Sequence, residues 1–253
     1  MADHSKMKLG KKPNPFLAAM PRLSQHLNLL KSRKPDRLVD YTNGITDWGM
    51  MGNDTIGLCV EASAAHAAQV WTQGNTTPYT GMLTPATKDV VTLYSQLTGY
   101  VPGDQSTDNG TIPNDMFKLW AATPLFGCKM LACASVALEN WLNLMFAISL
   151  FGGVFYSWEL PVSAQTQDVW DVVPDDGGVW GGHETFGCAY DDVEETISVI
   201  SWGKIIPVTQ EFWVKYCVEQ HVVLSDIGTG MLSRGPGGLD IEALKAEMAE
   251  LTN

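Results

Sequence analysis

Apolar positions follow helical spacing in the earlier part of the chain and form strand-like runs in the later part. Helices are predicted over residues 23–30, 58–72, 85–97, 114–122 and 209–217, with another ending at Gly152. Strands are predicted over residues 154–158, 184–190, 196–202 and 219–225. Thr84 and Pro85 suit the N-cap and first position of the helix over 85–97. Helices that precede strands in this order indicate an α+β fold.

The stretch from Asn140 to Trp158 carries no charge and could be mistaken for a membrane span. Gly152 and Gly153 divide it into a helical pattern and a run of strand-forming residues. A helix of about 13 residues covers only about 20 Å, which is shorter than a bilayer core of about 30 Å. We therefore predict a helix, a glycine stop and a buried strand, with no membrane contact.

Charge is distributed unevenly along the 253 residues. Residues 1–40 hold nine basic and three acidic side chains, a net +6, whereas the remainder carries −18, so that the whole chain is −12. The acidic remainder argues against a nucleic-acid-binding domain, and only the basic arm could contact a polyanion. The predicted division is a basic N-terminal arm (1–38), a folded body (39–227), and a glycine-rich linker with a short amphipathic helix (228–253). The apolar side of that helix would consist of Ile241, Leu244, Met248 and Leu251.

The five cysteines are sparse and lack the spacing of a disulfide framework or a zinc site. We therefore expect reduced thiols, no cofactor and no metal. The N-terminus has basic residues but no apolar segment after them, so no signal peptide is predicted.

Three segments suggest chemistry when they are taken together. The first runs from Asn53 to Cys59 at the start of an alanine-rich helix; the second is Trp180-Gly181-Gly182-His183; the third is Ile200-Ser201-Trp202-Gly203. A cysteine in the first turn of a helix lies at the positive end of the helix dipole, which favours its thiolate form. A nearby histidine could pair with that thiolate and protonate a leaving amine.

In order and spacing these segments resemble the papain-like cysteine peptidase superfamily over roughly residues 40–225. The resemblance implies a two-lobed α+β fold with a cleft between a helical lobe and a strand-rich lobe. Cys59 would be the nucleophile, His183 its partner, and Asn53 with the Cys59 amide the oxyanion donors. Ser201 and Trp202 would orient or shield the histidine. The substrate cleft would be lined by Asp108, Asn109, Gly110, Gly181 and Gly182.

More narrowly, the chain resembles uncharacterised proteins of tailed phages and bacteria that carry a GND-x-x-G-x-C helix start and a WGGH loop. Here these motifs are Gly52–Cys59 and Trp180–His183. One departure from the peptidase pattern stands out. Ile200 occupies the place of the asparagine that orients the histidine, and its side chain cannot bond an imidazole.

Two functions remain open on the sequence alone. In the first, the chain is a phage-type virion or assembly protein with a degenerate Cys59/His183 dyad. It would dock on acidic surfaces of neighbouring subunits through the arm and the C-terminal helix. It would be made in the host cytoplasm and end in the virion. In the second, it is an active cysteine peptidase or amidase that cleaves a peptide or isopeptide bond.

Overall fold

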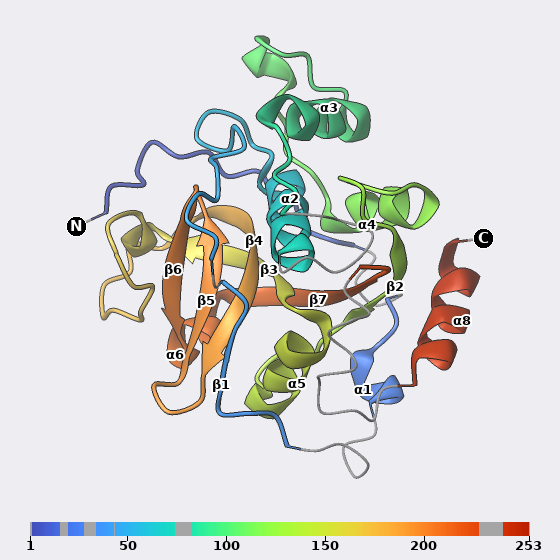
Figure 1. Ribbon diagram of the computed structural model, residues 1–253. Coiled ribbons are helices and arrows are strands. Elements are labelled where there is room, and N and C mark those ends of the chain that lie inside the picture. The colour runs from blue at the N-terminus through green and yellow to red at the C-terminus, as the bar shows by residue number, and fades with distance from the viewer. Residues whose placement is uncertain are drawn as a thin grey trace.

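The computed structural model describes residues 2–15, 20–27, 34–42, 44–73, 82–227 and 240–252, with the backbone alone for 247–252. One antiparallel sheet dominates it, with strand order β2-β7-β3-β4-β5-β6 and β1 paired with β4 (Figure 1). The strands are β1 (Leu38–Asp40), β2 (Met130–Ser135), β3 (Val154–Pro161), β4 (Val179–Asp191), β5 (Thr196–Ser201), β6 (Lys204–Thr209) and β7 (Cys217–Ser225). The α+β prediction is confirmed.

The central helix α2 (Cys59–Thr72) lies against the sheet, and all 14 of its residues are buried. Alanines at five positions keep this helix thin, so that β4 and β5 can pack closely on it. Together α2, α3 (Thr87–Thr98), η2 (Gln105–Thr107) and α4 (Pro113–Ala122) form a helical lobe beside the sheet (Figure 1). The other helices among the described residues are α1 (Leu23–His26), α5 (Trp141–Phe151), η3 (Val162–Gln165), α6 (Gln210–Tyr216) and α8 (Ile241–Thr252).

The uncharged stretch folds as predicted. Helix α5 ends at Gly152, which takes the left-handed conformation at φ 72°, and the buried strand β3 follows. Among the described helices, none has both the length and the apolar character that a bilayer crossing requires.

Three strands were not predicted. β1 and β2 are short and have no clear alternation of polar and apolar residues. β6 contains Pro207, which argues against a central strand, but β6 lies at the edge of the sheet, where a missing N–H is tolerated. The predicted N-cap is wrong: α3 begins at Thr87 after Ala86, so Thr84 and Pro85 lie before the helix.

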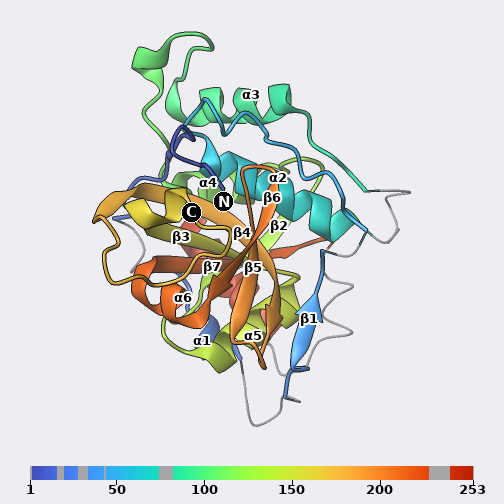
Figure 2. The same ribbon diagram turned by 90° about the vertical axis from the view of Figure 1, so that its left-hand side faces the viewer.

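The described parts of both tails lie on the body. Helix α8 packs against α1 and β2, and Leu244 is fully buried. The predicted linker over 228–238 and the side chains of Met248 and Leu251 lie outside the described residues. The first residues of the arm pass between the helical lobe and the sheet, as the dark blue trace in Figure 2 shows.

Candidate active site

Cys59 is the first residue of α2, and Leu58 at the N-cap supplies no side-chain cap. The turn before it is fixed by two contacts. The Asn53 side-chain amide donates to the Ile56 carbonyl over 3.2 Å, and the Gly57 amide donates to both carboxylate oxygens of Asp108 at 3.1 Å. The start of the helix is therefore held without using the amide of Cys59 itself.

His183 lies on β4, and its ring is fixed from two sides. Its Nε2 lies 2.8 Å from Oγ of Ser201, the last residue of β5. Its ring stacks on Trp202, with centroids 4.5 Å apart and an angle of 17° between the planes. Within the described part of the chain, Nδ1 is buried and has no hydrogen-bond partner, which makes it the nitrogen available for chemistry.

The β5–β6 hairpin explains why Ser201 reaches the histidine. Ser201 pairs with Lys204, and the two residues between them, Trp202 and Gly203, have φ values of 47° and 72°. Positive φ at both positions is the geometry of a tight two-residue hairpin turn, which is rare for a tryptophan. The turn places the indole over the imidazole while Ser201 ends the strand facing it.

The thiol of Cys59 lies beside the residue that follows His183. Backbone hydrogen bonds from Glu184 and Gly10 reach it and favour its charged form. Burial outweighs them, and together with the charges of Glu184 and Glu61 it raises the pKa of Cys59 to about 12. Burial, with a smaller effect of His4, lowers the pKa of His183 to about 3. Both groups are therefore neutral at pH 7 in this closed arrangement.

The arm closes the site. Lys11 donates its backbone N–H to the Gly182 carbonyl over 3.1 Å, and Lys12 donates to the Thr111 carbonyl over 2.9 Å. Thr111 in turn donates to the Gly10 carbonyl over 2.8 Å. Residues 10–12 thus bridge the sheet and the helical lobe directly over Cys59.

Glycines make room for this segment. A Cβ added at Gly10 would lie 1.7 Å from the Gly57 carbonyl oxygen. A Cβ at Gly110 would lie 2.1 Å from the Gly10 oxygen, and one at Gly182 would lie 2.2 Å from the Lys11 oxygen. The backbone of the arm and the walls of the cleft therefore touch without side chains between them.

The structure gathers most of the residues singled out from the sequence. Cys59 and the glycines 110, 181 and 182 adjoin residues 9–11 of the arm, and Ser201 and Trp202 contact His183. Asp108 instead ties the Gly57 turn to Tyr94, whose hydroxyl donates to it over 2.6 Å, and Asn109 is exposed. Ile200 is buried in β5 and pairs with Phe186, away from the imidazole contact that Ser201 makes.

Four residues of the site were not singled out for these positions. Gly10 and Lys11 belong to the predicted basic arm, and Glu184 and Glu219 belong to the predicted strands over 184–190 and 219–225. The Lys11 ammonium group lies 2.8 Å from the Glu219 carboxylate, and no local pattern predicts this pair because 208 positions separate the two residues. The described residues contain no cluster of three metal-ligating side chains.

Comparison with known proteins gives structural similarity only. No family model matches the chain, and no curated protein matches it in sequence. The solved structure of xylellain, a cysteine protease from Xylella fastidiosa, matches with a TM-score of 0.67 at 13% sequence identity. The match covers 86% of this chain and 96% of that one. The chain therefore has the α+β fold of the papain-like cysteine proteases.

Proposed function

We propose that the chain is a cysteine peptidase whose active site is closed by its own N-terminal arm. The observation that carries the proposal is the pairing of an uncapped helix start at Cys59 with a histidine whose Nε2 is held by Ser201. Because Nε2 bonds Ser201, Nδ1 of His183 is the nitrogen that accepts and releases the proton of the Cys59 thiol. The hydroxyl of Ser201 takes the orienting role that Ile200 cannot fill.

Departure of the arm changes the electrostatics of the pair. Water then reaches Cys59, and the desolvation that raises its pKa in the closed form is reduced. The helix dipole and the Glu184 amide still favour the thiolate. The thiol proton moves to Nδ1 of His183, which gives the reactive ion pair.

The reaction then follows acyl transfer. The thiolate attacks the peptide carbonyl carbon, and the resulting oxyanion accepts from the Cys59 amide. The side-chain amide of Asn53 donates one of its two hydrogens to the Ile56 carbonyl. The second hydrogen can donate to the same oxyanion. Nδ1–H of His183 protonates the departing amine, and water then hydrolyses the thioester and restores the thiol.

Activity of an opened full-length chain tests the proposal. Gly10→Ala forces the arm off the Gly57 carbonyl, since the added Cβ would lie 1.7 Å from its oxygen. The Gly10→Ala chain is expected to hydrolyse denatured casein or peptide libraries. The Cys59→Ala/Gly10→Ala double variant is the matched control and should hydrolyse neither.

The competing interpretation is the virion or assembly protein. In this interpretation the arm never leaves the cleft, and the permanently closed chain serves as a building block. A Gly10→Ala chain whose arm becomes sensitive to trypsin but which cleaves no peptide would contradict the peptidase proposal and favour this second role.

A further inference from the structure

The arm occupies the cleft as an extended peptide held mainly by its backbone. Its hydrogen bonds join Gly10, Lys11 and Lys12 to Thr111 on one wall and Gly182 on the other. Main-chain bonds of this kind hold an extended ligand without regard to sequence, and side-chain pockets supply specificity. The side chain that enters a pocket here therefore reports what the pocket accepts.

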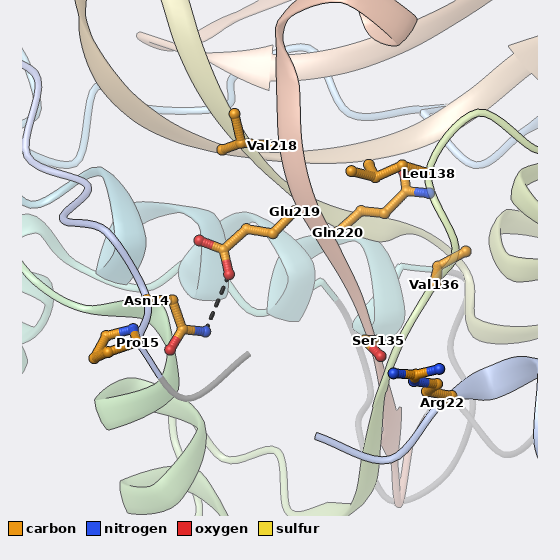
Figure 3. A pocket seen from close by; sticks show the side chains of 9 residues that line it. All are labelled: Asn14, Pro15, Arg22, Ser135, Val136, Leu138, Val218, Glu219 and Gln220. Atoms are coloured by element: carbon orange, nitrogen blue, oxygen red, sulfur yellow. Dashed lines mark hydrogen bonds between the residues drawn. The ribbon is translucent and has the colours of Figure 1, made fainter. Parts of the chain in front are cut away.

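Lys11 is that side chain. Its Nζ lies 2.8 Å from Oε1 of Glu219, and the two side chains are only 6% and 2% exposed. The second carboxylate oxygen of Glu219 accepts from the Asn14 side-chain amide over 3.0 Å, as Figure 3 shows. Both oxygens of a buried carboxylate on β7 are thus satisfied by the arm.

A second carboxyl group shares the pocket. Glu184 is 2% exposed and follows His183 on β4, and the hydroxyl of Ser157 donates to it. The charge of Glu219 raises the pKa of Glu184, and the charge of Lys11 lowers it. His221 and Cys217 are also buried, and the charges of Glu219 and Lys11 act on the pKa of each. Among these described neighbours of the pocket, Lys11 is the group that forms an ion pair with a carboxylate.

Loss of the arm leaves this pocket incomplete. Glu219 would lose the ammonium group and the Asn14 amide that bind its two carboxylate oxygens. A buried charge without a partner is strongly unfavourable, whereas a peptide that brings its own cation restores the pair. An apolar side chain of equal length would fill the space without satisfying the carboxylate.

We propose that the pocket filled by Lys11 selects a lysine or arginine side chain of the peptide substrate, through the buried carboxylate of Glu219. This inference rests on the proposed peptidase function and adds its substrate class. The arm then acts as a substrate-like occupant that carries the preferred residue.

Binding tests the pocket without turnover. The full-length Cys59→Ala/Gly10→Ala chain is titrated with peptides that carry lysine, arginine or norleucine at each position in turn. We expect one position at which lysine and arginine bind at least about 100-fold more tightly than norleucine. In the matched Glu219→Gln chain that ratio should fall close to one.

Equal binding of lysine and norleucine peptides at every position would overturn the inference while leaving peptide cleavage by Gly10→Ala intact. Selective binding without cleavage by Gly10→Ala would instead refute the peptidase and keep the pocket assignment. If Glu219→Gln does not fold, Lys11→Met in the otherwise natural chain tests the same ion pair. It should increase the trypsin sensitivity of the arm at least 10-fold over the exposed control Lys6→Met, and no increase would count against the pocket.

Discussion

His183 and Ser201 meet across the β4–β5 pair, with Nε2 of the imidazole 2.8 Å from Oγ of the serine. Both side chains are buried, so the bond is shielded from water. The orienting group of this site is therefore a hydroxyl on the last residue of β5, one position beyond Ile200. Its neighbour Trp202 completes the support by stacking on the ring.

Removal of that hydroxyl is expected to slow catalysis without blocking binding. In the Gly10→Ala background, Ser201→Ala should lower kcat roughly 10- to 100-fold with little change in KM, because the imidazole loses its fixed orientation. Steady-state kinetics over pH 5–9 measure this, and the limb of the profile due to the histidine should shift. Ser201→Thr keeps the hydroxyl and should recover most of kcat. An unchanged kcat and profile in Ser201→Ala would assign the bond a structural role only.

The arm contact predicts a difference in thiol reactivity. With the pKa of Cys59 raised to about 12, its thiolate is scarce at pH 7.5, and Gly10 covers it. In the natural chain, iodoacetamide should alkylate Cys59 no faster than it alkylates the buried Cys133, whose pKa is also raised to about 12. Gly10→Ala should speed Cys59 labelling at least about 10-fold and leave Cys133 unchanged.

Peptide mapping by mass spectrometry distinguishes the two thiols in one sample. Lys6→Ala is the matched control, since Lys6 belongs to the same arm but is exposed. Fast labelling of Cys59 in the natural chain would show that the arm does not protect it.

Sequence patterns point to the candidate pair Cys59 and His183 more readily than to the residues that contact this pair. Cys59 and His183 could be found because a helix start and a glycine-rich strand entry are local signals. The role of Ser201 depends on the two positive φ values at Trp202 and Gly203. Positive φ is rare for a tryptophan, so the sequence does not predict it. The pair of Lys11 and Glu219 depends wholly on the path of the arm through the cleft.

The same limit applies to the fold. Long helices such as α2 and α5 carry enough apolar positions to be predicted, with α2 observed at 59–72 against an expected 58–72. Edge strands such as β6 are short and are formed by pairing with a neighbour, so their residues carry a weak signal. The charge asymmetry was evident from the sequence, whereas the ion pair of Lys11 with Glu219 of the same chain was not.

Asp108 is expected to stabilise the turn that precedes Cys59. Its carboxylate accepts from the Gly57 amide and from the Tyr94 hydroxyl, so Asp108→Ala leaves two partly buried donors unsatisfied. We expect a loss of about 2–3 kcal/mol in the free energy of unfolding. Asp104→Ala is the control from the same loop. Asp104 is exposed, its carboxylate accepts hydrogen bonds from Ser106, and its loss should cost about 1 kcal/mol. Urea denaturation of both variants measures the difference, and equal costs would contradict the tie between the two loops.

Glu184 predicts a specific dependence of stability on pH. Burial and the charge of Glu219 raise its pKa from 4.5 to about 8, so between these values the folded chain holds a proton that the unfolded chain releases. The stabilising contribution of this carboxyl is therefore complete below pH 4.5 and is lost as pH rises toward 8. Glu184→Gln mimics the protonated form and cannot ionise. The free energy of unfolding of the natural chain should fall relative to Glu184→Gln as pH rises from 5 to 8.

Urea denaturation at pH 5, 6.5 and 8 gives that difference directly. The buried histidines act in the opposite direction, because the pKa values of His66, His183 and His221 are lowered to about 4, 3 and 4. They reduce stability as pH falls below 6.5, but they are present in both chains and cancel in the comparison to first order. A gap that stays constant from pH 5 to 8 would mean that Glu184 is ionised in the folded chain throughout. In that case the pocket around Lys11 would hold two carboxylates at neutral pH instead of one.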